Sequence, residues 1–257
     1  MQKLFIKNRS GKRIALILDT VADQKGVVFI AHGRGGFKEQ EHINAFSEAF
    51  KQAWYSTIRW DARNTVGESE GLMEDVTITS YYEDLVDVIS WAKLQPWYQE
   101  PFILCGHSLG GIIAILYAEK FREKVKALAP ISTVVSWSLS KETFDSKLLE
   151  NWENVGYYNE ESKSTPGLIR KMKWAYIADR TGYDVLKEAS ALIMPVLLIV
   201  GENDHSTPLE HQQILYEAIP HTKKELHIIK GAEHTFREKK HLEEIKDIIL
   251  KFVKSID

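Results

Sequence analysis

PFILCGHSLGGIIAILYAEKF, residues 101–121, is the stretch of this 257-residue chain that decides its fold. PFILC is a continuous apolar run, which is typical of a strand buried on both faces of a parallel sheet. LGGIIAILYAEKF reads as a helix that begins directly afterwards. The glycines between them supply the small residues that a sharp, crowded turn requires. A buried strand that turns abruptly into a helix predicts an α/β fold.

The same alternation of strands and helices extends outward from this stretch. LFIKN and RIALILD predict an antiparallel pair at the start of the chain. Further strands are predicted at 26–32, 56–60, 125–132, 194–201 and 225–231, and helices near 39–52, 79–94, 209–218 and 238–255. This order predicts a mostly parallel, doubly wound sheet, in which ligands bind at the carboxyl ends of the strands.

Residues 134–189 break the alternation and are rich in aromatic side chains. We predict a partly helical cap here, inserted into a core domain made of residues 1–133 and 190–257. The aromatics either line an apolar acyl pocket or form the small core of the cap itself, and we assign most of them to the second role. They are Trp137, Phe144, Trp152, Tyr157, Tyr158, Trp174, Tyr176 and Tyr183.

Composition excludes several classes of function. The net charge is −3, which gives no indication of a nucleic acid or an anionic membrane surface as partner. The single cysteine, Cys105, permits no internal disulfide and no thiolate metal cluster. The first residues lack a signal-peptide pattern, and no apolar run is long enough to span a membrane. We therefore expect a soluble cytoplasmic protein without a metal or organic cofactor. A homo-oligomer is compatible with the sequence but is not predicted.

Two segments match the pattern G-x-S-x-G, which often marks the nucleophile of a serine hydrolase: GESEG at 67–71 and GHSLG at 106–110. The chemistry requires a serine on a sharp turn between a buried strand and a helix, where the next backbone N–H helps to bind an oxyanion. Ser69 has neither neighbour, and its flanking glutamates would oppose an adjacent oxyanion. Ser108 has both. We predict Ser108 as the nucleophile, against the alternative of a structural serine at a helix N-cap.

A serine nucleophile needs a base and an acid that orients the base. In α/β-hydrolases they follow in the chain order Ser, Asp or Glu, His. GENDHSTP, residues 201–208, follows a late strand and offers Asp204, with Glu202 as the fallback acid. The alternative role of Asp204 is to close a turn or cap the next helix. His234 follows the last strand and is the predicted base. His211 and His241 lie on predicted helices, where a solvated face is the expected position.

An oxyanion site needs a second amide, which the segment HGRGG at 32–36 can supply. We predict that the Arg34 and Leu109 amides form it, because clustered glycines let a backbone approach a ligand closely. The alternatives are a bare glycine-rich turn or a phosphate cradle, although the spacing of a P-loop is absent. Residues expected to line the substrate site are Gly33, Gly35, His107, Trp137 and His205, and for His205 an exposed loop position is an equal alternative.

HGRGG, DARNTVGESEG, GHSLGG, GENDHSTP and GAEHTF together resemble the α/β-hydrolase-fold serine hydrolases over most of the chain outside the cap. The chain looks most like small bacterial carboxylesterases, including cinnamoyl and feruloyl esterases, with monoacylglycerol lipases and serine aminopeptidases nearby. The resemblance explains GESEG as part of a structural loop, D-x-R-G-x-G-x-S-x-G, in which Asn64 replaces the usual glycine. At Arg34 the family more often has a small or apolar residue, and this side chain either contacts a polar or anionic substrate group or points to solvent.

The resemblance implies hydrolysis of a small-molecule carboxylic ester through Ser108, His234 and Asp204. Amides, thioesters and peptides are alternatives, since the same triad serves them all. A binding protein with an idle triad is a further alternative. The sequence predicts neither the natural substrate nor the mobility of the cap.

Overall fold

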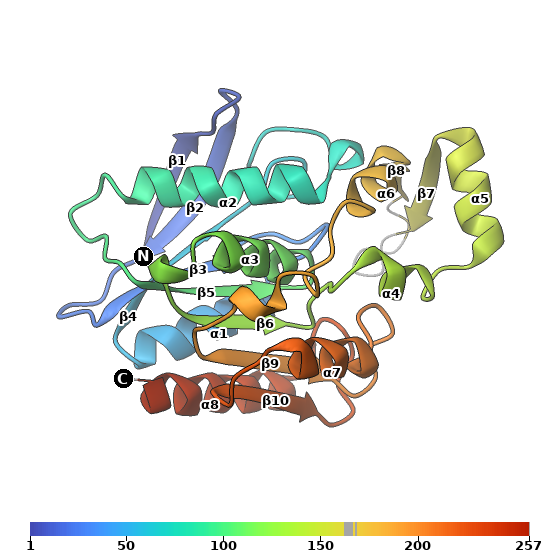
Figure 1. The fold of residues 1–257 in the computed structure, drawn as a ribbon. Coiled ribbons are helices and arrows are strands. Elements are labelled where there is room, and N and C mark those ends of the chain that lie inside the picture. Colours follow the sequence, from blue (N-terminus) through green and yellow to red (C-terminus); the bar gives the residue numbers. More distant parts are fainter. Residues whose placement is uncertain (162–166, 168, 257) are drawn as a thin grey trace.

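An eight-stranded sheet runs through the computed structural model, which describes residues 1–161, 167 and 169–256 (Figure 1). The strand order across the sheet is β1-β2-β4-β3-β5-β6-β9-β10. In chain order these strands are β1 Gln2–Lys7, β2 Arg13–Asp19, β3 Gly26–Ala31, β4 Tyr55–Trp60, β5 Phe102–His107, β6 Val125–Ile131, β9 Val196–Gly201 and β10 Lys224–Ile229.

The sheet is mostly parallel, as predicted. β1 pairs antiparallel with β2, and β2 pairs antiparallel with β4. Every further pairing, from β4 across to β10, is parallel. The α/β-hydrolase fold and its antiparallel first pair are therefore confirmed, and the loops after β3, β5, β9 and β10 all leave the same end of the sheet.

Helices cover both faces of the sheet, and its strands β3, β4 and β5 are buried along their whole length. α1 Glu41–Gln52 and α8 Lys239–Ile256 pack together on one face. α2 Ile78–Ala92, α3 Leu109–Lys120 and α7 Leu209–Ala218 cover the other. In β5, Phe102 and Leu104 pack in the hydrophobic core on the side of α2, α3 and α7. Ile103 and Cys105 pack in the core on the side of α1 and α8. Because successive strand side chains point to opposite faces, two buried faces require this continuous apolar run.

The segment between β6 and β9 contains the elements that were least predictable. It holds α4 Trp137–Lys141, α5 Ser146–Val155, β7 Tyr157–Glu161, β8 Ile169–Lys173 and α6 Ala175–Arg180, which gather at one end of the molecule in Figure 1. β7 and β8 form an antiparallel two-stranded sheet that the sequence did not indicate. Of the two strands only Met172 is buried, so their apolar periodicity is weak.

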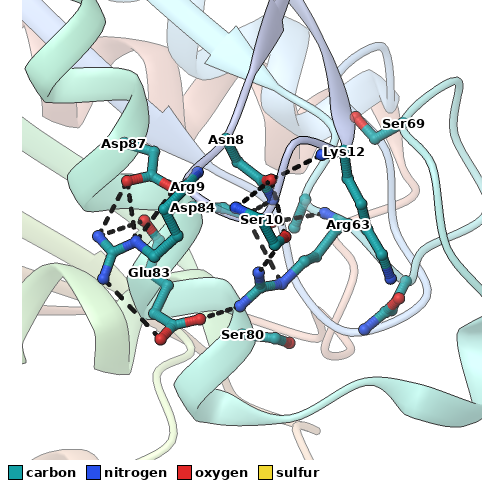
Figure 2. A network of polar contacts seen from close by, with 12 residues as sticks. Asn8, Arg9, Ser10, Lys12, Arg63, Ser69, Ser80, Glu83, Asp84 and Asp87 are labelled. Carbon is teal, nitrogen blue, oxygen red and sulfur yellow. Dashed lines mark hydrogen bonds and ion pairs between the residues drawn. The ribbon is translucent and has the colours of Figure 1, made fainter.

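A polar network ties the turn between β1 and β2 to α2 (Figure 2). Asn8 donates to the buried carboxylate of Asp84 at 3.0 Å, and the Arg63 amide donates to its other oxygen at 2.6 Å. Arg9 pairs with Asp87 at 2.9 Å. Burial raises the pKa of Asp84 to about 6 in spite of these donors. The network joins the antiparallel edge of the sheet to α2.

Within the described residues, no helix has the length and apolar character needed to cross a membrane.

Candidate active site

Ser108 lies at the turn between β5 and α3 in a backbone conformation that few residues adopt. Its φ is +55° and its ψ is −113°, and strain of this kind is concentrated at functional sites. The flanking glycines permit the turn. A Cβ on Gly106 would lie 2.1 Å from the Gly110 carbonyl oxygen, and one on Gly110 would lie 2.2 Å from the Ala31 carbonyl oxygen. Glycine is therefore required at both ends of G-x-S-x-G, because neighbouring backbone atoms occupy the space that a Cβ would fill.

His234 and Asp204 come together with Ser108, although they are far apart in the sequence. His234 Nε2 lies 3.0 Å from Ser108 Oγ, and His234 Nδ1 lies 2.8 Å from Asp204 Oδ2. His234 follows β10 and Asp204 follows β9, so the parallel strands deliver all three side chains to one edge. Glu202, the fallback acid, instead accepts from the Gly231 amide at 2.8 Å and is exposed.

The surroundings of Asp204 keep it ionised. Burial alone would raise the pKa of its carboxyl, but the hydrogen bond and charge of His234 and the donors of Thr207 outweigh burial and lower that pKa. The Ser206 and Thr207 amides each donate to Asp204 Oδ1 at 2.9 Å. An ionised Asp204 fixes the proton of neutral His234 on Nδ1, which leaves the Nε2 lone pair directed at the Ser108 hydroxyl.

Two further buried histidines pack behind His234. His107 Nε2 donates to the His234 carbonyl oxygen at 2.7 Å, and burial lowers the pKa of His107 well below its usual range. The ring of His42 lies 4.5 Å from that of His107, and burial lowers the pKa of His42 to about 3. Both rings are therefore neutral. His42 was not predicted from the sequence, since a lone histidine on an amphipathic helix gives no signal.

The loop after β3 presents a fixed peptide beside Ser108. The Gly33 carbonyl oxygen lies 2.7 Å from His32 Nδ1, 3.0 Å from the Gly36 amide and 3.3 Å from the Tyr81 hydroxyl. His32 Nε2 accepts from the Ala62 amide at 3.0 Å, so Nδ1 carries the proton and donates. Because a trans peptide directs N–H and C=O oppositely, these donors also fix the direction of the Arg34 N–H.

The Arg34 and Leu109 amides have no acceptor within the part of the chain that the structure describes. Among the residues that the structure describes, neither donates a hydrogen bond, and Leu109 is the first residue of α3. Both residues line the same cavity as Ser108. A Cβ on Gly33 would lie 3.0 Å from Ser108 Cβ, which shows how closely the loop approaches the serine.

Ser69 is occupied by the fold. Its hydroxyl donates to the Asp61 carbonyl oxygen at 2.6 Å and accepts from the Ala15 amide at 2.8 Å. Asn64, which stands where the similar family has glycine, has a φ of +62°, a conformation that asparagine adopts more readily than most residues. The loop after β4 therefore has a structural part, which matches the role implied by the resemblance.

A cavity of about 830 Å³ opens over Ser108, and several charged side chains form part of its walls. Arg34, Arg170, Arg180 and Arg237 line it together with Glu160, Glu161 and Glu233. Of the aromatic residues in 134–189, only Phe144 and Tyr176 line it within the described part of the chain. A second cavity of about 50 Å³ also reaches Ser108, and Gly33, His42 and His107 border it.

Of the predicted substrate-site residues, some line the large cavity and others do not. Gly35 and His205 line the large cavity, and His205 is also exposed. Trp137 does not line it: its ring packs against Phe144, with 6.0 Å between centroids, and Arg180 lies over its face.

The expectation of solvated positions for His211 and His241 was wrong. Both are buried, because their helices direct those side chains inward.

The Arg34 side chain is held by the protein instead of pointing freely to solvent, which was one of its two expected positions, and it lines the large cavity. Its guanidinium forms a two-point ion pair with Glu160 of β7, at 2.9 and 3.0 Å, and lies over the ring of Tyr176 in α6. Arg34 therefore joins the loop after β3 to β7 and α6. Sequence reasoning had no means to find Glu160, which lies 126 residues away in an unpredicted strand.

The described residues contain no group of three or more His, Cys, Asp or Glu side chains arranged to hold a metal ion.

Comparison with known sequences places the chain in one family. The sequence profile of Hydrolase_4, described as serine aminopeptidase, S33, matches residues 22–155 and 151–240. The chain is also 24% identical over 215 residues to the human palmitoyl-protein thioesterase ABHD10, mitochondrial, covering 83% of this chain and 68% of that protein.

Solved structures show the same fold. The structure described as ferulic acid bound to Est1E from Butyrivibrio proteoclasticus superimposes with a TM-score of 0.84 at 23% identity, and 98% of each chain is covered. ABHD10 from mouse superimposes with a TM-score of 0.83 at 19% identity, with all of each chain covered.

Proposed function

Because the chain belongs to the Hydrolase_4 family of α/β-hydrolases, we propose that it is a serine hydrolase that cleaves carboxylic esters through Ser108, His234 and Asp204. One observation carries the proposal: Ser108 Oγ, His234 and Asp204 form a continuous chain of hydrogen bonds at 3.0 and 2.8 Å on a strained strand-to-helix turn. We also propose that residues 134–189 form a cap over this site and that the substrate is a small molecule.

The first half of the reaction makes an acyl-enzyme. Ser108 Oγ attacks the ester carbonyl carbon while its proton passes to His234 Nε2. Asp204 stabilises the imidazolium that results. The carbonyl oxygen becomes an oxyanion, which accepts from the Arg34 and Leu109 amides. When the tetrahedral intermediate collapses, the carbon–oxygen bond to the alcohol breaks and His234 returns its proton to the leaving alkoxide.

The second half repeats these steps with water. His234 Nε2 takes a proton from a water molecule as its oxygen attacks the acyl carbon. The same two amides hold the second oxyanion. Collapse releases the carboxylic acid, and the proton on His234 returns to Ser108 Oγ. The fixed Gly33 carbonyl supports the role of the Arg34 amide, since a donor held in place costs no reorganisation during the reaction.

Thioesters are a second candidate because the human relative ABHD10 is named as a palmitoyl-protein thioesterase. We propose esters of small or polar acids over that class of acyl chain, because of the charged side chains in the cavity walls. Burying a long hydrocarbon chain is favourable only against apolar surface, and four arginines and three glutamates line this cavity.

The test compares wild type, Ser108→Ala and Ser69→Ala on p-nitrophenyl acetate, butyrate and octanoate and on methyl ferulate. We expect Ser108→Ala to lose on the order of 10⁶-fold in kcat, because the triad acts as a unit. Ser69→Ala, once shown to be folded by circular dichroism, should retain kcat within about tenfold. Wild type that cleaves no ester and is not labelled at Ser108 by a fluorophosphonate would refute the proposal.

A further inference from the structure

Arg180 is a buried cation in the wall of the large cavity. It ends α6, its side chain is largely enclosed, and the residue is only 5% exposed, yet it borders the same space as Ser108. Arginine remains protonated in proteins, so Arg180 brings a permanent positive charge into this wall. Buried charges are ordinarily paired, because an uncompensated charge loses much of its hydration.

No carboxylate within the described residues forms an ion pair with Arg180. Nη1 donates to the Tyr176 hydroxyl at 3.2 Å, and Nε is buried with no acceptor. The guanidinium lies over three aromatic rings, at 5.8 Å from Trp137, 5.9 Å from Phe144 and 5.8 Å from Tyr176. These rings stabilise a cation, but they accept no conventional in-plane hydrogen bond.

Two other arginines that line the cavity, Arg34 and Arg237, differ from Arg180 in their partners or their exposure. Arg34 has a two-point ion pair with Glu160. Arg237 is exposed, and its Nε donates to Thr235 at 3.1 Å. Both lie on the same cavity as Arg180. Arg180 is therefore more buried than the half-buried Arg34 and, within the described residues, lacks its counter-charge.

We propose that Arg180 binds a free carboxylate of the substrate, so that the enzyme prefers esters that carry a second, ionised carboxyl group. The inference rests on the proposed ester hydrolysis and names its substrate class. A planar carboxylate matches the edge of a guanidinium, and its hydrogen bonds to a cation are about twice as strong as neutral ones. Among the described residues, the Tyr176 hydroxyl that meets Nη1 is the one hydrogen-bond acceptor of this guanidinium, so donors remain for such a ligand.

The experiment measures kcat/KM for two matched pairs of esters. Monoethyl adipate is compared with the neutral ester in which an isopropyl group replaces the carboxylate. The acetate ester of an ω-hydroxyalkanoic acid is compared with its own isopropyl isostere, which places the charge on the alcohol side instead. We expect wild type to prefer the charged member of one pair by about 10- to 100-fold, and added salt to reduce that ratio.

Arg180→Gln should abolish the preference, and Arg180→Lys should retain only part of it, because lysine keeps the charge without the planar fork. Arg237→Gln is the matched control: it removes a cation from the same cavity and should leave the ratio within about twofold. Equal losses on charged and neutral esters in Arg180→Gln would assign Arg180 a structural role and overturn the inference.

The inference and the proposed function fail separately. Hydrolysis of neutral esters without any preference for charged ones in wild type would overturn the carboxylate site alone. If no ester is cleaved, the proposed function fails, and calorimetric titration of Ser108→Ala with monoethyl adipate decides the inference. Binding that disappears in the Ser108→Ala, Arg180→Gln double variant supports it, and absence of binding contradicts it.

Discussion

Glu119 in α3 is a carboxyl whose surroundings favour its protonated form. Burial and the negative charges of Glu188 and Asp184 raise its pKa to about 8, and Oε1 has no hydrogen-bond partner among the described residues. The ordinary value is 4.5, so the folded protein holds this proton more tightly than the unfolded chain does. Its linked stability is therefore full below about pH 4.5 and is lost as the pH rises through about 8.

Glu119→Gln removes this titration while keeping the shape of the side chain. We expect the variant to match wild type in Tm at pH 5 and to exceed it progressively up to pH 9. Thermal unfolding at a series of pH values measures the difference. Glu123→Gln alters an exposed glutamate one turn further along the chain and should leave the pH dependence of wild type unchanged.

Residue identity was predictable where a motif and a strand end coincided. Ser108 and Asp204 each follow a strongly apolar strand, and His234 follows the more polar last strand, so the order of strands in the sequence indicated one common edge. Arg180 gave no such signal, because an arginine at the end of a short amphipathic helix ordinarily faces water. It lies over the rings of Trp137, Phe144 and Tyr176, and the packing of these residues arises only in the folded protein.

At the scale of elements, the close contact between α3 and β3 at Gly110 can be tested by substitution. Gly110→Ala would place a Cβ 2.2 Å from the carbonyl oxygen of Ala31 in β3, and a backbone atom cannot move aside cheaply. We expect a loss of about 1–3 kcal/mol or more in the free energy of unfolding, measured in urea, and a fall in kcat as the Leu109 amide shifts.

Gly182→Ala supplies the comparison for that variant. Its new Cβ would lie 3.4 Å from the nearest atom, the Asp179 carbonyl oxygen, which is ordinary contact. Its stability should therefore stay near that of wild type. Equal stability of the two variants would show that β3 and α3 do not touch as described.

Elements with a strong apolar period were predicted closely, and those without one were not. The predicted helix at 238–255 corresponds to α8, Lys239–Ile256, whose buried residues recur at helical spacing. β7 and β8 alternate charged and half-buried side chains and pair mainly with each other. A two-stranded sheet with few buried side chains leaves little trace in a sequence.

Across the whole molecule, one buried ion cluster joins three distant segments. Lys38, from the loop after β3, pairs with Asp61 at 2.8 Å and with Glu68 at 2.7 Å, and the Lys38 and Asp61 side chains are 1% and 0% exposed. Lys3 of β1 reaches the same Glu68 at 2.8 Å. Removal of the central cation would leave the Asp61 carboxylate buried without its counter-charge.

Lys38→Met should therefore cost about 3–5 kcal/mol in the free energy of unfolding. Lys51→Met, which breaks a surface pair with Glu48 on α1, should cost less than about 1 kcal/mol. Denaturation in urea gives both values. A loss in Lys38→Met as small as that in the surface variant would mean that apolar packing, not the ion cluster, holds these segments together.

The position of Cys105 has a practical consequence for how the molecule opens. This thiol lies on the central strand, three residues before Ser108, and burial raises its pKa far above the usual range. A disulfide reagent such as Ellman's can react with it only while β5 is transiently uncovered. The rate at which the sole cysteine reacts therefore reports how often β5 opens next to Ser108. A covalent ligand on Ser108 should slow this reaction.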